Sequence, residues 1–329
     1  MAVIAFIVHR FGYMLITMAI VSVLGFIIIN LPPGTYLDVR IAELESQGTS
    51  TAAEQIRALE SRYGLDLPLY QQYFKWITGF IKGDFGRSFQ FNQEVKDLIG
   101  DRLLLTIVVA TATLIFSWVV ALPIGIYSAV NQYSKGDNFF TFLGFLGLSI
   151  PNFLLALILL VLAWVIFDVS LVGLFSREME DAPWSFAKFV DLLKHLWIPV
   201  LVVGTEGTAG LIRVMRGNLL DILNMQYVMT ARAKGLEERV VIYKHAVRNA
   251  IHPLIMQLGL SLPSIISGST VVAIVLSLPI TGSLYFNALR AQDMYLAGTF
   301  LMFLAIMLII GNFIADLLLA WVDPRIRFD

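Results

Sequence analysis

Glu206 is the residue of this sequence whose type and position most invite a chemical role. It lies in segment 201–210, which otherwise contains only apolar, glycine and threonine residues. An ionisable group in a long apolar segment is costly and usually faces an aqueous cavity or a partner. Arg213 lies on roughly the same helix face but about 10 Å further along the axis, too far for a direct pair. We expect Glu206 to line a water-filled path or to pair with a partner chain. A hydrated position near the edge of the apolar segment is the alternative.

Asp316, in another apolar segment, is a weaker second candidate for such a path. Familiar catalytic patterns are missing from the sequence. No G-x-x-x-x-G-K-[ST] motif is present to cradle a nucleotide phosphate, and the absence of cysteine excludes thiol catalysis and disulfides. No serine or threonine is arranged recognisably as a nucleophile. The four histidines have no metal-ligand spacing: His9, His195, His245 and His252. We expect a non-catalytic chain that holds no metal or cofactor of its own.

Composition explains why charged residues are so few. Of 329 residues, 58% are hydrophobic and 14% are charged, whereas soluble proteins average roughly 45–50% apolar and about 25% charged residues. This balance excludes a disordered chain, a coiled coil, a basic nucleic-acid binder and most soluble enzymes. It predicts an all-α integral membrane protein.

Six apolar runs have the length that a membrane helix needs, about 20 residues. Pro123, Pro151 and Pro263 lie inside three of them, which membrane helices tolerate when neighbouring groups satisfy the freed backbone. The first run is longer than a signal-peptide core and no small-x-small cleavage site follows it, so we expect a retained helix. The predicted spans are residues 11–31, 103–130, 139–167, 196–212, 251–279 and 297–322.

Charges in the loops predict the orientation of these spans. The loop between the fourth and fifth runs has seven basic residues against three acidic ones, whereas the loop between the third and fourth runs is acidic on balance. Short basic loops stay in the cytoplasm. With an even number of spans, both termini are then expected to be cytoplasmic.

We expect three regions: residues 1–31 with the first span, a polar outer insert 32–102, and a five-span core 103–329 that contains a second polar segment, 217–253. In the insert, Thr51 and Glu54 form a helix capping box, and an aromatic stretch over 69–81 predicts a second helix. That aromatic stretch is typical either of a small structural cap or of a docking surface for an external partner.

The second polar segment, residues 217–253, is basic and cytoplasmic in this topology. We expect one helix over 218–234, a reversal at Gly235, where a positive φ is easily adopted, and a second helix over 236–248. Val240, Val241 and Tyr243 interrupt its polar surface. A short helix with exposed apolar residues favours docking into a partner's groove. The alternative is a basic loop that only fixes topology.

Several segments closely resemble those of binding-protein-dependent ABC importer permeases of the dipeptide/oligopeptide permease family. Segments 227–236 and 245–253, YVMTARAKGL and HAVRNAIHP, are similar to the family's cytoplasmic coupling loop. Residues 64–70 and 83–88 look like its outer-loop signatures, residues 323–327 like its terminal motif, and Arg10 like its basic start. Together these motifs span nearly the whole chain in the family's order.

The resemblance implies half of a transmembrane channel with six helices of the type I importer kind and a helical outer insert, in a bacterial or archaeal plasma membrane. Its implied partners are a second related permease, two cytoplasmic ATPases that use ATP and Mg²⁺, an external solute-binding protein and the lipid bilayer, with no nucleic acid. The implied ATPase-coupling residues are Thr230, Ala231, Arg232, Gly235, Leu236, Glu237, Arg239, Val240, Tyr243 and Lys244.

Alternatives remain for the cargo and for the class of protein. The family implies di- or oligopeptide cargo. However, Pro279-Ile-Thr-Gly282 replaces the usual Pro-Gly-x-Gly turn, and Pro32-Pro-Gly departs from the usual end of span one, as in members linked to oligosaccharide uptake. An ion-coupled secondary transporter predicts midplane charges in repeated, broken helices, and no internal repeat is evident. A membrane-embedded enzyme would need a catalytic constellation, which is missing.

Overall fold

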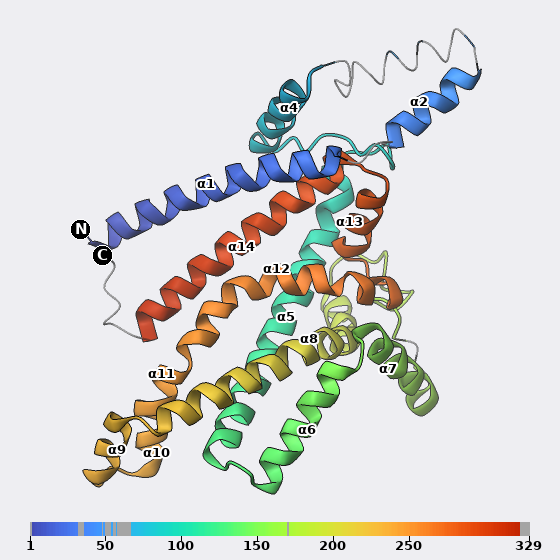
Figure 1. The fold of residues 1–329 in the computed structure, drawn as a ribbon. Coiled ribbons are helices and arrows are strands. Elements are labelled where there is room, and N and C mark those ends of the chain that lie inside the picture. Colours follow the sequence, from blue (N-terminus) through green and yellow to red (C-terminus); the bar gives the residue numbers. More distant parts are fainter. Residues whose placement is uncertain are drawn as a thin grey trace. The chain divides into compact units, whose positions relative to one another are not determined.

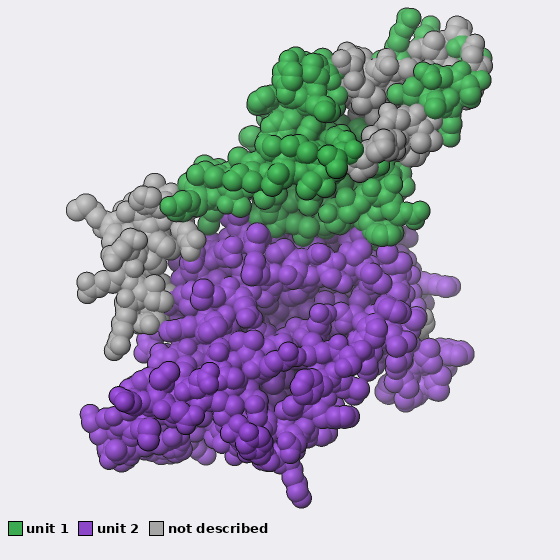
Figure 2. All heavy atoms as spheres, in the orientation of Figure 1, with its two compact units in different colours: residues 1–104, 283–306 green, residues 105–282, 307–329 purple. Residues whose placement is uncertain are grey.

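A computed structural model describes residues 2–31, 36–47, 67–169 and 171–322, together with positions 49, 54 and 57. The described chain is helical and forms no extended strand, which confirms the all-α fold class. It divides into two compact units (Figure 2): residues 1–104 with 283–306 form unit 1, and residues 105–282 with 307–329 form unit 2. Residues 283–306 therefore belong with the N-terminal part of the chain, a grouping that no sequence signal indicated.

Unit 1 is built around an aromatic core. Trp76 on α4 is buried, and Phe26 on α1 packs edge-to-face on Tyr73 with the ring centroids 5.5 Å apart. The Ser22 and Tyr73 hydroxyls lie 2.8 Å apart in a hydrogen bond, which fixes α4 on α1. The helices of unit 1 (Figure 1) are α1 (Ala2–Asn30), α2 (Tyr36–Gln47), α4 (Leu69–Ile81), the start of α5 (Val95–Val130), most of α13 (Thr281–Arg290) and the first part of α14 (Met294–Val322).

Helix α4 confirms the helix predicted over 69–81 and separates its aromatic residues into two faces. Tyr73, Trp76 and Phe80 belong to the core of unit 1. Tyr70 and Phe74, on the other face, are 61% and 60% exposed. The inner face is therefore a structural cap, while the outer apolar stripe is uncovered in this chain.

Unit 2 holds the longest helix, α8, which packs on α6, α7 and α12. Two apolar cores fill the unit. One surrounds Val109, Ile198 and Leu276, and the other surrounds Met215, Val241 and Leu254. Its helices are α6 (Lys135–Ser149), α7 (Asn152–Phe167), α8 (Phe186–Leu223), α9 (Gln226–Ala233), α10 (Glu238–Val240), the π-helical stretch η1 (Val241–Val247), α11 (Arg248–Ala250) and α12 (His252–Val275), with the remainders of α5 and α14.

Four described helices are long and apolar enough to cross a membrane: Gly12–Asn30, Val95–Val130, His252–Val275 and Met294–Leu319. They correspond to the first, second, fifth and sixth predicted spans. The fourth lies within α8, which is not among these four helices. The count of six spans stays a prediction.

The third predicted span differs from a single helix. Pro123 and Pro263 remain inside α5 and α12, but Pro151 precedes the first residue of α7. Helices α6 and α7 meet at an angle of 104° there. Ile150 adopts an extended conformation with ψ 121°, as expected for a residue that precedes proline. The apolar run 139–167 is therefore a bent pair, either a broken span or a re-entrant loop.

Some sequence predictions fall outside the described residues. These are the start of the capping box at Thr51, the end of span one at Pro32-Pro33-Gly34, the start of the 64–70 signature, and the terminal motif 323–327.

Candidate coupling surface, cavity and outer buckle

The turn at Gly235 is confirmed, and its geometry explains the glycine. The Gly235 amide donates to the Arg232 carbonyl (2.9 Å) and the Leu236 amide donates to the Ala231 carbonyl (3.4 Å). This is the paired bonding of a Schellman helix end. Gly235 has a φ of +74°, and a Cβ there would meet nothing within 4 Å. The backbone conformation, not a lack of space, requires glycine at this position.

The segment after the turn differs from the single α-helix predicted over 236–248. Helix α10 passes into η1 and then α11. In a π-helix the hydrogen bonds join residues five apart, and Val241 and Ala246, five apart, are both fully buried. The two buried side chains thus lie five residues apart, as the hydrogen bonds of a π-helix do. The charge pattern had indicated an α-helix instead.

The inner face of this segment packs on α8. Val228 of α9 and Val241 of η1 are fully buried against Met215 and Leu219. Ala231, one of the ten residues that the resemblance assigned to coupling, is 7% exposed and belongs to the same core. It supports the segment from inside rather than offering a contact surface.

The outer face carries the other nine coupling residues, all exposed. Its apolar members are Tyr243 (61% exposed), Leu236 (42%) and Val240 (36%). We call this face the coupling surface; it consists of Thr230, Arg232, Gly235, Leu236, Glu237, Arg239, Val240, Tyr243 and Lys244.

One ion pair crosses the Gly235 turn. An Nη atom of Arg232 lies 2.7 Å from Oε1 of Glu238, with both side chains largely exposed. The hydrogen bond from Arg232 lowers the pKa of the Glu238 carboxyl. An exposed pair of this kind contributes roughly 0–1 kcal/mol to stability, so it orients the turn more than it stabilises it.

Two polar contacts fix the segment to its neighbours in unit 2. Asn249 Nδ2 donates to the Tyr227 hydroxyl (2.8 Å), joining α11 to α9. Arg248 Nε donates to the Val322 carbonyl at the end of α14 (2.6 Å). A cation at the last carbonyls of a helix also complements the helix dipole.

A part-buried ion pair joins α8 to α6. Arg216 donates from Nε to Oδ1 of Asp137 (2.9 Å) and from an Nη atom to Oδ2 (2.8 Å). The Tyr133 amide adds a third bond to this carboxylate (2.9 Å), and Asp137 is only 1% exposed. Sequence reasoning missed this two-pronged geometry, since the partners lie 79 positions apart and no local pattern links them.

A cavity of about 600 Å³ opens in unit 2 between α5, α6, α7, α8 and α12. Glu206 and Arg213 both line it, and Asn152 Nδ2 donates to Oε2 of Glu206 (3.1 Å). The guanidinium of Arg213 lies over the Phe145 ring, 5.9 Å from its centroid. Asp316 is half-buried on α14 and is not among the residues that line the cavity.

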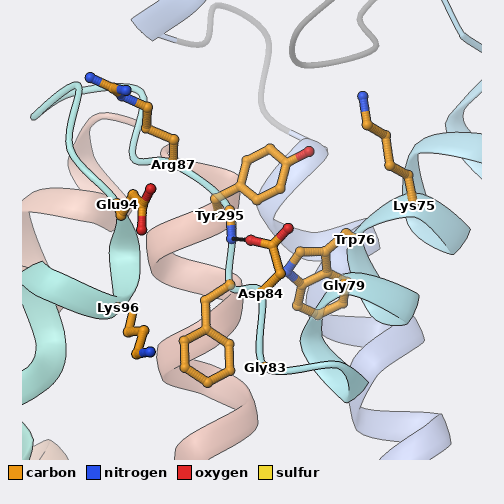
Figure 3. Close-up of a pocket in the computed structure, with 11 residues that line it drawn as sticks. Lys75, Trp76, Gly79, Gly83, Asp84, Arg87, Glu94, Lys96 and Tyr295 are labelled. Atoms are coloured by element: carbon orange, nitrogen blue, oxygen red, sulfur yellow. Dashed lines mark hydrogen bonds between the residues drawn. The ribbon is translucent and has the colours of Figure 1, made fainter.

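A second cavity, of about 540 Å³, lies in unit 1 (Figure 3). Trp76 and Tyr295 flank Asp84, whose Oδ1 accepts the Gly86 amide (3.0 Å). The Lys75 and Arg87 side chains extend away from the Asp84 carboxylate. A Cβ on Gly86, which has a φ of +74°, would overlap the Tyr295 ring. The 83–88 motif is thus a tight loop closed against α14.

Asp293 holds this loop. Its carboxylate accepts hydrogen bonds from the Ser88 hydroxyl, the Gln90 amide (3.1 Å) and the Leu296 amide (3.1 Å), the last of which caps α14. Ser88 and Asp293 are fully buried. Burial raises the pKa of Asp293, and the bond from Ser88 opposes that rise. We call this group the Asp293 buckle: residues 83–95 with 293–296. Sequence reasoning singled out 83–88 but not Asp293, because 205 positions separate it from Ser88.

Comparison with known proteins decides the family. A family model described as the inner membrane component of binding-protein-dependent transport systems matches residues 121–328. A second model, for the N-terminal part of these membrane components, matches residues 3–110. The chain belongs to this family.

Individual relatives match the permease over almost its whole length. It is 37% identical to the oligopeptide transport system permease protein AppB of Bacillus subtilis, over 94% of each chain. It is 34% identical to a putative peptide permease protein of Brucella ovis, over 97% of this chain and 98% of the other. It is 30% identical to the dipeptide transport system permease protein DppB of Escherichia coli, over 98% of each.

Family membership fixes the role in outline. The permease is the membrane subunit of an ATP-driven importer, a multi-pass plasma-membrane protein with a transport role rather than a catalytic one, and it works with ATPase and binding-protein partners.

Proposed function

We propose that this permease forms half of the membrane path of a peptide importer. Its support is the near full-length match to three permeases named for oligopeptide, peptide and dipeptide transport. None of these three is named for an oligosaccharide, so the proposal is peptide cargo rather than sugar cargo. The other half of the path is a second, related permease.

The coupling surface is the proposed contact with the ATPases. Tyr243, Leu236 and Val240 give it an apolar centre, while Arg239 and Lys244 give it a basic rim. Protein–protein interfaces typically have an apolar centre with aromatic side chains, surrounded by a polar or charged rim. The coupling surface has this arrangement. Two cytoplasmic ATPases would supply the groove, and ATP and Mg²⁺ would bind to them, not to the permease.

The remaining proposals concern orientation and cargo delivery. Residues 217–253, which carry the coupling surface, are proposed to lie in the cytoplasm, and with six spans both termini would lie there too. The outer stripe of Tyr70 and Phe74 then lies outside, where an external binding protein delivers solute. Glu206 lines the path; Asp316 is a weaker candidate, since it lies outside the cavity lining.

Replacing Tyr243 by alanine tests the coupling proposal. We expect ATP-driven uptake in proteoliposomes to fall at least tenfold and the ATPase subunits to be lost on copurification, because truncation of a central interface aromatic costs about 2 kcal/mol or more. The amount of permease in the membrane should not change, since Tyr243 packs on nothing in the core.

Phe186→Ala is the matched control, because Phe186 is an exposed aromatic (81%) on the same unit but outside the coupling surface. Deletion of residues 236–244 should abolish uptake altogether. Wild-type uptake and ATPase retention in Tyr243→Ala would contradict the assignment.

A further inference from the structure

The cavity of unit 2 presents two opposite charges on one helix. Glu206 and Arg213 both lie on α8 and both line the cavity wall. No ion pair joins these two described side chains. Seven residues at 1.5 Å per residue separate them by about 10 Å along the axis. Each charge is therefore available to a ligand group of the opposite sign.

Each of these two exposed charged groups has a contact within the unit. Asn152 donates to one carboxylate oxygen of Glu206, which leaves the other oxygen open to a donor. Arg213 rests over the Phe145 ring and has no hydrogen-bond acceptor among the described residues. A carboxylate with a free oxygen and a guanidinium with free N–H groups would each form charge-assisted hydrogen bonds with a suitable ligand.

We propose that Glu206 and Arg213 bind the two ends of a linear peptide, the terminal ammonium at Glu206 and the terminal carboxylate at Arg213. An extended chain spans at most 3.3–3.6 Å per residue, so a separation of about 10 Å corresponds to about three residues. This inference rests on the proposed peptide function and adds to it the groups that recognise the cargo.

The rest of the wall is consistent with cargo of varied sequence. Leu114, Val203 and Leu260 are apolar, while Ser261 and Gln257 offer neutral hydrogen-bonding groups. None of these carries a charge that would select one peptide side chain. A neutral oligosaccharide would leave both charges of α8 without a counter-charge, whereas every unmodified peptide brings one of each sign.

Direct binding of tri-alanine to the permease–ATPase complex in lipid nanodiscs, without the binding protein, tests this inference by calorimetry. Charge-assisted hydrogen bonds are worth about tenfold or more in affinity. We expect Glu206→Gln and Arg213→Gln each to weaken binding about tenfold. The wild type should prefer tri-alanine to its C-terminal amide. Glu206→Gln should keep that preference and Arg213→Gln should lose it. The wild type should also prefer tri-alanine to N-acetyl tri-alanine; Arg213→Gln should keep this second preference and Glu206→Gln should lose it.

Glu178→Gln and Lys194→Gln are the matched controls, because each removes the same charge from an exposed position of unit 2 outside the cavity. Equal affinity of the wild type for tri-alanine and its amide, or loss of the second permease from either cavity variant, would overturn the inference. ATP-driven tri-alanine uptake by the wild type distinguishes failure of this inference from failure of the proposed peptide-import function. If uptake occurs and the cavity variants behave like the controls, only the inference fails; if no peptide is taken up, the proposed function fails.

Discussion

The Asp293 buckle and the coupling surface both contain a glycine with a φ of +74°, at Gly86 and Gly235. Around Gly86 the polar side chains bind one another: Ser88 and Asp293 are fully buried and mutually bonded. Around Gly235 the side chains are exposed, and the one ion pair, Arg232 with Glu238, lies at the surface. The polar groups of the first region bond one another inside unit 1, whereas those of the second lie at the surface.

A sequence motif can mark either a segment that stabilises the fold or a segment that contacts a partner, and this difference distinguishes the two cases. Both segments were recognised by resemblance, residues 83–88 as an outer-loop signature and residues 227–236 as part of the coupling loop. The buried hydrogen bond from Ser88 to Asp293 ties residues 83–88 into unit 1, whereas Leu236, Val240 and Tyr243 form an exposed apolar face. Substitutions should therefore damage stability in the buckle and transport in the coupling surface.

Asp293→Ala should have the largest effect on stability. It leaves the Ser88 hydroxyl and the amides of Gln90 and Leu296 buried without an acceptor, at roughly 1–3 kcal/mol for each group. We expect a loss of about 4 kcal/mol, seen as a large drop in the thermal unfolding midpoint of the purified permease. Asp293→Asn, which keeps one oxygen, should lose less. An unchanged midpoint for Asp293→Ala would remove the distinction between the two regions.

Alanine at each of the two glycines sharpens the comparison. Gly86→Ala combines the cost of a positive φ, about 1 kcal/mol, with overlap on the Tyr295 ring, so we expect a loss of about 3 kcal/mol. Gly235→Ala meets open space and should lose about 1 kcal/mol only. Denaturation of the two variants side by side checks this order, and equal losses would contradict it.

The contributions of Asp293 and Glu238 to stability should depend on pH with opposite signs. These are the smallest of the expected effects. The raised pKa of Asp293 means that its contribution is fully present below the unfolded pKa and is lost as pH rises through the folded value. The lowered pKa of Glu238 means that its contribution is present above the unfolded pKa and is lost as pH falls through the folded value. The measurement is the difference in unfolding midpoint between the wild type and each of two variants, Asp293→Asn and Glu238→Gln, at pH 4 and at pH 7. From pH 4 to pH 7 the two differences should change in opposite directions. Glu238 should contribute below about 0.5 kcal/mol. A shared direction would contradict the two environments.

Local signals in the sequence predicted much of this structure. Apolar length located α1, α5, α12 and α14, the aromatic stretch over 69–81 located α4, and Gly235 marked the chain reversal. Each of these depends on neighbours within one helix or one turn, where hydrophobic runs, proline and glycine act directly on the backbone.

Long-range contacts could not be predicted in the same way. Asp293 bonds Ser88, and Asp137 bonds Arg216, across separations that no spacing rule covers. The bend at Pro151 was also missed, because proline inside an apolar run fits either a kinked span or a break. Ala231 matched a coupling motif in sequence, but only packing against Met215 shows that it faces inward.

The winding of the π-helical stretch η1 affects the direction in which the side chains of the following helix, α12, point. Since one residue advances an α-helix by about 100°, removing a single residue from Val241–Val247 would turn α12 by that angle relative to Leu236 and Val240. Gln257, Leu260 and Ser264, which line the cavity, lie on α12. In η1 each backbone hydrogen bond spans five residues instead of four, so a change in its winding would rotate the α12 residues of the cavity wall relative to Leu236 and Val240.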